Sequence, residues 1–311
     1  MIRYLESSDI DPQQWDRCVA ASDYSTIFAS FDFLSAASDR WGALVTGEYE
    51  SVMPLPYRSR FGMKYIFSPP FISRLGIYSK HKIDHALEKK MIEMIPKKFV
   101  LIDLVLNPLH QYPETTTHIS YQLALNQEYE QLKKQYNENT KRNLKKVNEE
   151  ELIYSQDVNI EQVIDLFSNN RGENVKLPKH FYSTLLKLSK VADQQGGLEK
   201  KAVYDQSGNL LAAALFLHDF QRVWFWFSGR DQAKSDQMGM FFLIDQWIRE
   251  NANRELILDF NGSNNPNIAR FYRGFGAEKY EYPFYQKKKK GLKMIICIYR
   301  YLKKIVSLQK K

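Results

Sequence analysis

The sequence predicts an α/β protein that is large enough for two modules. The chain has 311 residues, of which 44% are hydrophobic and 14% aromatic, so it can bury a sizeable core. Apolar runs typical of buried strands alternate along the chain with segments of helical periodicity. A stretch rich in Pro, Thr and His at 107–120 predicts the junction, and we divide the chain into modules at 1–120 and 121–311.

The first module is predicted to contain helices and strands in mixed order. Helices are expected at Asp11–Ala21, Phe31–Ser38 and Lys82–Ile95, and strands at Ala43–Val45, Ser51–Arg58 and Phe99–Leu106. Pro12 suits the first turn of a helix, where no backbone N–H is needed. The aromatic segment Tyr65–Tyr78 is expected to form turns, because Pro69 and Pro70 exclude a central strand.

The second module is predicted to begin with a short strand and a long basic helix. The expected helices are Tyr129–Val147, Ile160–Asn170, Lys179–Val191 and Gly239–Asn251, and the expected strands are Tyr121–Leu125, Leu198–Tyr204, Leu210–Leu217, Arg222–Phe227 and Lys279–Tyr285. The turn Gln206–Asn209 predicts a hairpin between two of these strands. Ser228–Gln237 is expected to be a polar loop, and a basic amphipathic helix is expected to end the chain.

The stretch Leu256–Ala277 predicts a buried strand, a polar turn and a short helix in direct succession. Leu256–Phe260 is apolar except for Asp259, and the next six residues favour turns or helix starts. A strand that runs into such a turn leaves polar groups at its carboxyl end, where sites are commonly built. The alternative is a simple packing unit in which Asp259 caps the helix or pins the turn.

The charge balance permits a polyanionic partner without requiring one. The formal net charge is +8, which suits RNA, a phosphorylated cofactor or an acidic membrane surface. The basic runs Lys287–Lys290 and Lys303–Lys311 flank the amphipathic end of the chain, and a peripheral membrane contact through this basic C-terminus is one hypothesis. The alternative is that this helix packs on the second module and carries a solvated basic tail.

Cysteine and histidine usage predicts neither a disulfide framework nor a metal site. Cys18 and Cys297 lie far apart in the sequence, and the six histidines lack ligand spacing. The first residues contain no apolar signal core, and no apolar run reaches the roughly 20 residues of a membrane helix. We therefore expect a cytoplasmic protein without disulfide partners.

Three passages resemble FemAB-like tandem GNAT proteins, which belong to the acyl-CoA N-acyltransferase fold. They are Tyr136–Val147 (YNENTKRNLKKV), Asp259–Ala277 (DFNGSNNPNIARFYRGFGA) and, more loosely, Met53–Tyr78. The resemblance implies two GNAT-like modules, each a twisted mixed sheet flanked by helices, that face each other across a cleft. It also implies transfer of an acyl or aminoacyl group to an amine on a cell-envelope precursor, a polysaccharide or a small molecule.

The resemblance places the donor at the loop Lys234–Gly239 (KSDQMG), before a predicted helix. The cofactor-binding residues expected there are Lys234, Gln237, Met238 and Gly239, together with Asn261 after the following strand. In the family, this loop holds a pyrophosphate on backbone N–H groups at a helix start. Only Gly239 matches the usual pattern, and Fem-type relatives use aminoacyl-tRNA in place of acyl-CoA. The donor is therefore acyl-CoA or aminoacyl-tRNA, and a solvated loop is the alternative.

The resemblance also suggests which residues carry the chemistry. Tyr272 matches the position of a tyrosine that protonates the leaving group, and Asp259 is expected to act as a base or to orient the amine. The substrate-binding candidates are Lys141, Arg142, Arg230, Ser263 and Arg270. A core tyrosine, a capping aspartate and a solvated basic helix are the competing interpretations.

Two other functions stay open from the sequence. One is a CoA-dependent N-acetyltransferase of small molecules, and the other is a non-catalytic GNAT-like protein that binds a polyanion. The intact Asp259–Tyr272 unit favours an enzyme, whereas the degenerate loop before Gly239 favours a binding protein.

Overall fold

The computed structural model describes residues 1–60, 62–109, 115–147, 151–169, 177–234, 238–261, 265–289 and 291. The strands are β1 (Ile2–Glu6), β2 (Trp41–Thr46), β3 (Ser51–Arg60), β4 (Met63–Phe67), β5 (Tyr78–Ser79), β6 (Phe99–Val105), β7 (Thr115–Ala124), β8 (Leu152–Ser155), β9 (Leu198–Asp205), β10 (Leu210–Asp219), β11 (Arg222–Arg230), β12 (Ile257–Asp259) and β13 (Glu278–Lys288). The α-helices are α1 (Pro12–Ala20), α2 (Phe31–Ala37), α3 (His85–Glu93), α4 (Tyr129–Lys134), α5 (Glu138–Leu144), α6 (Ile160–Phe167), α7 (Lys179–Gln194), α8 (Gly239–Asn251) and α9 (Pro266–Arg273).

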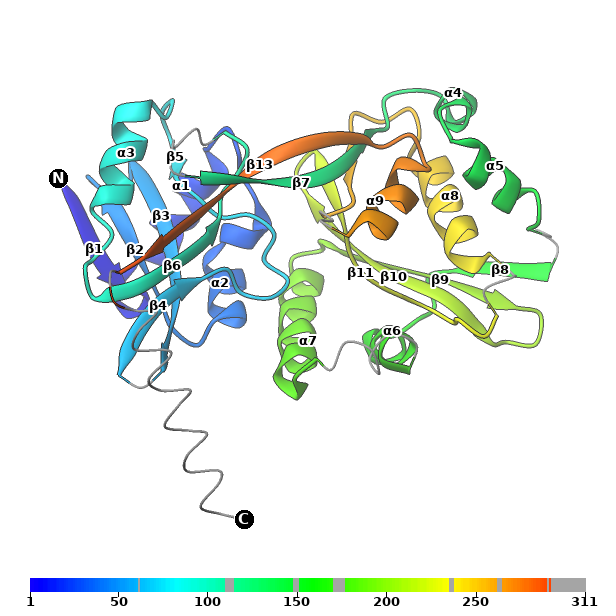
Figure 1. Ribbon diagram of the computed structural model, residues 1–311, viewed down its shortest axis with the longest axis horizontal. Helices are drawn as coiled ribbons and strands as arrows, with labels where there is room; N and C mark the ends of the chain where they lie inside the picture. Colours follow the sequence, from blue (N-terminus) through cyan, green and yellow to red (C-terminus); the bar gives the residue numbers. More distant parts are fainter. Residues whose placement is uncertain are drawn as a thin grey trace, which may run out of the picture.

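The described strands form one continuous mixed sheet, which confirms the predicted α/β class. The strand order is β1-β2-β3-β4-β6-β13-β7-β12-β11-β10-β9-β8, with β5 paired to β3. The pairs β4–β6 and β11–β12 are parallel, and the other pairs in this order are antiparallel. Figure 1 shows β7 and β13 as a long ribbon that joins the two halves of the molecule.

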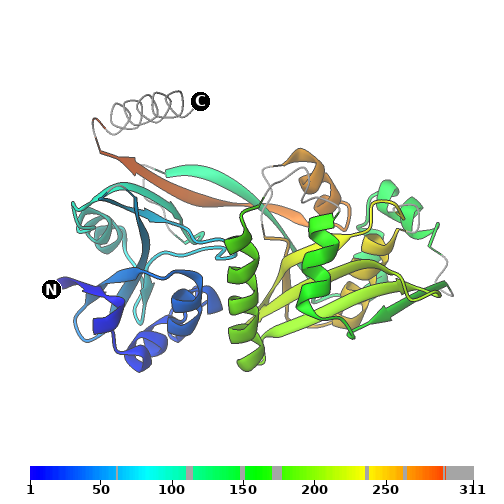
Figure 2. The ribbon, with the colours of Figure 1, turned by 90° about the horizontal axis from the view of Figure 1, so that it is seen from below.

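Helices cover both faces of the second half of the sheet. Along β10, Leu215 and Leu217 point to a core with α6 and α7, whereas Ala214 and Phe216 point to a core with α8. This alternation follows from the two-residue period of a strand, and both faces of β10 are apolar because both are buried. Figure 2 shows α6 and α7 on the same face of these strands. In the first half, α3 packs on a separate core around β3 and β6.

The boundary that we predicted between residues 120 and 121 lies inside a strand. Thr115–Ala124 is the continuous strand β7, which pairs with β12 on one side and β13 on the other. The expectation that 115–120 is a connecting stretch is therefore wrong. In addition, β13 returns from the second half to pair with β6 over Phe284–Lys288. The division into two modules across a cleft stays a prediction.

The prediction of one continuous helix over Tyr129–Val147 is wrong, because the structure has two helices there, α4 and α5. The break lies at Asn137, whose side chain accepts a hydrogen bond from the Thr140 N–H at 2.9 Å and so caps α5. The Asn137 N–H donates to the Gly274 carbonyl at 3.0 Å, so the turn is tied to the end of α9. Tertiary contact and the Asn cap outweigh the helical periodicity here.

Other differences concern strands at edges and ends. β1 and β8 were not predicted, and both are edge strands with one partner each. β4 was assigned to turns, but it ends at Phe67, before the prolines that prevent a longer strand. β11 continues through Ser228–Arg230, which we expected to be loop, because these residues pair with Ala212–Ala214. The predicted C-terminal helix lies outside the described residues.

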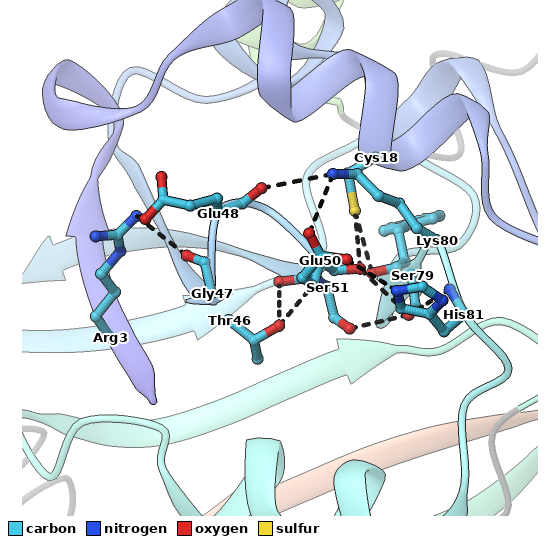
Figure 3. A network of polar contacts seen from close by, with 11 residues as sticks. Arg3, Cys18, Thr46, Gly47, Glu48, Glu50, Ser51, Ser79, Lys80 and His81 are labelled. Carbon is cyan, nitrogen blue, oxygen red and sulfur yellow. Dashed lines mark hydrogen bonds and ion pairs between the residues drawn. The ribbon is translucent and has the colours of Figure 1, made fainter.

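A polar network holds the turn between β2 and β3 against α1 (Figure 3). Glu50 forms ion pairs with Lys80 at 3.5 Å and with His81 at 2.9 Å. The Cys18 thiol is free and buried, and it contacts the carbonyls of Glu50 and Tyr78 at 3.6 and 3.7 Å. Burial raises the pKa of the Cys18 thiol to about 11, so this side chain is a structural thiol.

Candidate active site

The candidate site lies where two parallel strands separate. β11 and β12 pair only over Arg222–Trp224 and Ile257–Asp259, after which β12 ends. β11 continues to Arg230, and no described strand pairs with it on that side beyond Trp224. A register shift between Leu215 and Phe216 of β10 adds to this divergence, because a bulge bends its sheet. The separation leaves a crevice at the carboxyl end of a parallel pair.

The crevice contains a pocket, here called the donor pocket, with a volume of about 220 Å³. It is lined by Phe167, Phe225, Ser228, Gly229, Arg230, Gln232, Met240, Asn267, Ile268, Phe271 and Tyr272. These residues come from the end of α6, the part of β11 beyond its pairing with β12, the segment after β11, the start of α8 and the helix α9 (Figure 1). The mixture of aromatic walls and a few polar groups is typical of a small-molecule site.

Tyr272, which the sequence predicts as a proton donor, lines this pocket from α9. Its ring stacks on Phe260 with centroids 4.6 Å apart and meets the edge of Phe225 at 6.2 Å. The side chain is half-buried, and its ring is held between these two aromatic neighbours.

Arg230 and the start of α8 supply the positive character of the donor pocket. Arg230 is exposed at the end of β11, and Met240 follows the first residue of α8. Met238 adopts the left-handed conformation with φ 54° and turns the chain into this helix. A Cβ on Gly239 would lie 3.0 Å from the Leu211 Cβ, so glycine lets the helix start close to β10. Gln237 lies outside the described residues.

Two predicted cofactor residues lie elsewhere. The Lys234 ammonium donates to the Asp205 carboxylate at 2.7 Å, in the turn between β9 and β10, and it does not line the donor pocket. This bond, together with those from Asn209, holds the pKa of Asp205 well below its usual range. Asn261 has φ 57° and accepts a hydrogen bond from the Ser73 hydroxyl at 2.5 Å. Local salt-bridge and turn geometry thus direct both side chains away from the pocket.

Asp259 is the centre of a buried polar network. Its side chain is 0% exposed. One oxygen accepts from the Ser120 hydroxyl at 3.0 Å and from the Asn261 N–H at 2.8 Å. The other accepts from Arg222 at 2.7 Å and from the Tyr280 hydroxyl. Both oxygens of the Asp259 carboxylate therefore already accept hydrogen bonds from the protein. This favours a positioning role for Asp259 over the predicted role as a base.

Arg74 completes this network, and sequence reasoning missed it. Its guanidinium lies 4.0 Å from Asp259 and faces the rings of Trp224, Tyr280 and Tyr282 at 5.0, 5.1 and 4.2 Å. The side chain is 1% exposed although the residue belongs to the first half of the chain. The sequence did contain a sign of this role, because Arg74 lies within the aromatic stretch Tyr65–Tyr78 and arginine binds the faces of aromatic rings.

The predicted substrate residues are distributed over several places. Lys141 pairs with Glu138 at 3.2 Å, and Arg142 donates to Asn139 at 3.0 Å. Both line a separate surface hollow of about 500 Å³ between α4, α5 and α8. Arg270 is exposed on α9, whereas Ser263 lies outside the described residues. Of the four that the structure describes, Arg230 lines the donor pocket with Tyr272, and Lys141, Arg142 and Arg270 do not.

The described part of the chain lacks a metal cluster and a membrane-spanning helix. No group of three or more His, Cys, Asp or Glu side chains is arranged to hold a metal ion there. Within the same residues, no helix combines the length and the apolar composition needed to cross a membrane.

Comparison with solved structures identifies the fold. No protein-family model and no curated protein sequence matches the chain. The crystal structure of FemX is similar over 90% of this chain and 96% of its own, with a TM-score of 0.63 and 11% identity. L-PGS from Bacillus licheniformis is similar over 94% of this chain and 96% of its own, with a TM-score of 0.52 and 8% identity. A conserved protein of unknown function from Bacteroides thetaiotaomicron is similar over 92% of this chain and its full length, with a TM-score of 0.57 and 10% identity. The chain therefore shares the fold of FemX, in agreement with the resemblance of its sequence motifs to FemAB-like proteins.

Proposed function

We propose that the chain transfers an acyl or aminoacyl group from an activated donor to an amine. The observation that carries this proposal is the separation of β11 from β12, which opens the donor pocket between Tyr272 and Arg230. The fold shared with FemX adds support, because the FemAB-like resemblance implies the same class of reaction. The reaction joins an amine nitrogen to the carbonyl carbon of the donor and releases the donor's thiol or hydroxyl.

The residues around the donor pocket suit the individual steps of that reaction. The amine attacks the carbonyl carbon, and the oxygen that becomes negative needs N–H donors nearby. The part of β11 beyond Trp224 presents a backbone edge there, with no strand partner among the described residues. In this proposal Tyr272 gives its hydroxyl proton to the leaving thiolate or alkoxide, and the proton that the amine releases to water restores the tyrosine hydroxyl.

In this mechanism Asp259 is a positioning residue. It is bonded by Arg222, Ser120 and the Asn261 N–H, so it fixes the end of β12 and the start of the turn toward α9. Phe260 follows it directly and stacks on Tyr272 at 4.6 Å. The buried network therefore holds the ring that supports the proposed proton donor.

The donor is acyl-CoA or aminoacyl-tRNA, and each fits a different part of the surface. Arg230 and the start of α8 border the donor pocket and suit a phosphorylated cofactor. Lys141 and Arg142 lie in the hollow between α4, α5 and α8, together with Lys133, Lys134 and Lys145. A run of cations of this kind suits a nucleic-acid backbone. The two donors can therefore be distinguished by variants at the two places.

Titration calorimetry with acetyl-CoA, a longer acyl-CoA and charged tRNA tests the proposal. Binding of a CoA ester that weakens in Arg230→Gln and persists in Arg142→Glu identifies the pocket as a CoA site. Binding of charged tRNA that weakens in Arg142→Glu, with a reduced salt dependence, identifies an aminoacyl-tRNA donor. Absence of binding to all three ligands contradicts a transferase.

A further inference from the structure

The last described strand, β13, leaves the second half of the sheet and ends in the first half. Its final residues, Phe284–Lys288, pair with β6, and the Lys289 N–H donates to the Val100 carbonyl at 2.9 Å. This end of β13 lies at the opposite end of the molecule from α4, α5 and α8 (Figure 1). The residues after β13 therefore begin away from the second half, which disfavours the alternative that they pack there.

Three consecutive lysines form this end of β13. Lys287, Lys288 and Lys289 are exposed, and among the described residues none of them has an ion-pair partner. Lys287 lies opposite Ile102 in the ladder and Lys288 opposite Leu101, so their side chains point to opposite faces of the sheet. Cations on both faces give the end of the strand a positive potential, which attracts a polyanionic surface.

The neighbouring surface of the first half contains further cations and an exposed apolar side chain. Lys64 lies opposite Phe99 at the start of β6, beside which β13 ends. Met94 begins the short connection from α3 to β6 and is 48% exposed, and Lys97 is exposed in the same connection. This combination of cations with an apolar side chain suits contact with a charged surface that has an apolar interior.

The stretch 287–311 is distinguished by its charge. It contains ten of the 44 Lys and Arg residues of the chain and none of its 36 Asp and Glu residues, so the net charge of +8 originates entirely there. Ile298 and Leu302 are four residues apart, as on one side of a helix. Arg300 and Lys304 have the same spacing two residues further on, so this pattern separates basic from apolar side chains. Basic and apolar residues in this arrangement are typical of a segment that lies in a membrane interface.

We propose that the end of β13 and the residues after it bind the surface of a membrane that contains anionic phospholipids. The lysines contact the headgroups, and apolar residues such as Ile298 and Leu302 enter the boundary between headgroups and acyl chains. Electrostatic attraction and apolar insertion are each weak at a membrane surface, and their combination gives stable attachment. A nucleic acid backbone would use the lysines alone, so the contribution of the apolar residues distinguishes a membrane from other polyanions.

Co-sedimentation with vesicles at physiological salt tests this surface. We expect the wild-type chain to bind vesicles of mixed phosphatidylglycerol and phosphatidylcholine, and to bind pure phosphatidylcholine vesicles about tenfold or more weakly. The triple variant Lys287→Gln/Lys288→Gln/Lys289→Gln should bind the anionic vesicles about 100-fold more weakly than the wild type. The reason is that each lysine near such a surface contributes about fivefold to the affinity.

Two further variants separate local charge from net charge and from apolar insertion. The matched control, Lys134→Gln/Lys145→Gln/Lys146→Gln, removes the same charge from exposed positions in the other half of the molecule and should bind like the wild type. Ile298→Ser/Leu302→Ser keeps every charge and should bind the anionic vesicles about tenfold or more weakly, because less apolar surface is buried. Thermal unfolding verifies that all variants are folded.

Several results would overturn the proposal. Absence of binding to the anionic vesicles does so directly, and equal weakening in the matched control does so because the effect is then one of net charge. Unchanged vesicle binding in the apolar variant excludes insertion into the membrane. Binding of charged tRNA that is lost in the triple lysine variant, without binding to vesicles, assigns the lysines to a nucleic acid instead. Vesicle binding requires no acyl donor, so failure of the proposed transferase function leaves this test unaffected.

Discussion

The Arg74 guanidinium lies 4.0 Å from the Asp259 carboxylate, and these side chains are 1% and 0% exposed. Arg74 belongs to the segment between β4 and β5, whereas Asp259 ends β12. This buried pair therefore ties a loop of the first half of the chain to the strand that leads into the candidate site. Aromatic rings of Trp224, Tyr280 and Tyr282 surround the guanidinium and exclude water from it.

Removal of one partner of this pair is expected to be strongly destabilising. Arg74→Met leaves Asp259 with one cation fewer in a buried place, and such a change costs about 3 kcal/mol or more in the free energy of unfolding. Chemical denaturation of the wild type, Arg74→Met, Asp259→Asn and the double variant measures the loss and its coupling. Arg222→Gln serves as the control, because the Arg222 side chain is 19% exposed. We expect this variant to lose less of the free energy of unfolding than Arg74→Met. Equal losses in the two arginine variants would contradict the special position of Arg74.

Tyr272→Phe is expected to lower turnover and to leave folding intact. The variant keeps the ring that stacks on Phe260 and removes only the hydroxyl beside the donor pocket. Loss of a positioned proton donor lowers kcat by about 100-fold or more, with little change in KM. Steady-state kinetics with the donor identified by calorimetry measures the effect. Tyr182→Phe on α7 is the matched control, and normal turnover in Tyr272→Phe would exclude the role in protonation.

Gly229→Ala is expected to disturb the donor pocket through the backbone of α6. A Cβ on Gly229 would lie 2.7 Å from the Phe167 backbone nitrogen and 3.0 Å from the Leu166 backbone carbonyl carbon. Because backbone atoms cannot move aside as a flexible side chain does, the end of α6 must shift, at a cost of about 1–3 kcal/mol. The melting temperature and the affinity for the acyl donor should both fall. Ser228→Ala, at the neighbouring lining position, should change neither by a comparable amount.

The ionised Glu199 carboxylate contributes to the free energy of unfolding, and this contribution depends on pH. Burial disfavours its ionised form, but hydrogen bonds from His218 at 2.7 Å and Trp247 at 3.0 Å outweigh this and lower the pKa of Glu199. A carboxyl whose pKa is lower in the folded than in the unfolded state stabilises the fold above its ordinary pKa of 4.5. That contribution is lost as the pH falls below 4.5 through the folded-state value.

Glu199→Gln tests this dependence. Near neutral pH the variant should be less stable than the wild type by about 1–2 kcal/mol, because bonds to the charged carboxylate are lost. Denaturation measured over a series of pH values should show the difference shrinking as the pH falls below 4.5. Glu255→Gln, at an exposed position, should show little difference at any pH. If the difference in the free energy of unfolding between wild type and Glu199→Gln stayed the same at every pH, the charge of Glu199 would not be its cause.

The sequence predicted those elements whose pattern is local. The apolar run before Asp259, the turn after it and the helical spacing up to Phe275 all lie within one short stretch, and β12 and α9 occur there. The hairpin of β9 and β10 has its turn residues between its strands. In contrast, β1 and β8 gain strand structure through single distant partners, β2 and β9, which no local pattern specifies.

The candidate site was predicted in part, for the same reason. Tyr272 was proposed from its position in the motif and Arg230 from its place after an aromatic strand, and both residues line the donor pocket. Lys234 was misplaced because its partner, Asp205, belongs to a separate hairpin. Arg74 and Arg222 were missed because their contact with Asp259 joins segments that are remote in the chain.

By itself, the sequence determined the α/β class, the FemAB-like motifs and the strand–turn–helix unit that contains Asp259 and Tyr272. Only the tertiary structure decided that Asp259 is enclosed by polar side chains from β7, β11, β13 and the segment between β4 and β5. It also decided that Tyr272 lines a pocket together with residues of α6, β11 and α8. The reason is physical: periodicity and turn propensity act between near neighbours in the chain. Burial and ion pairing depend on which distant segments pack together.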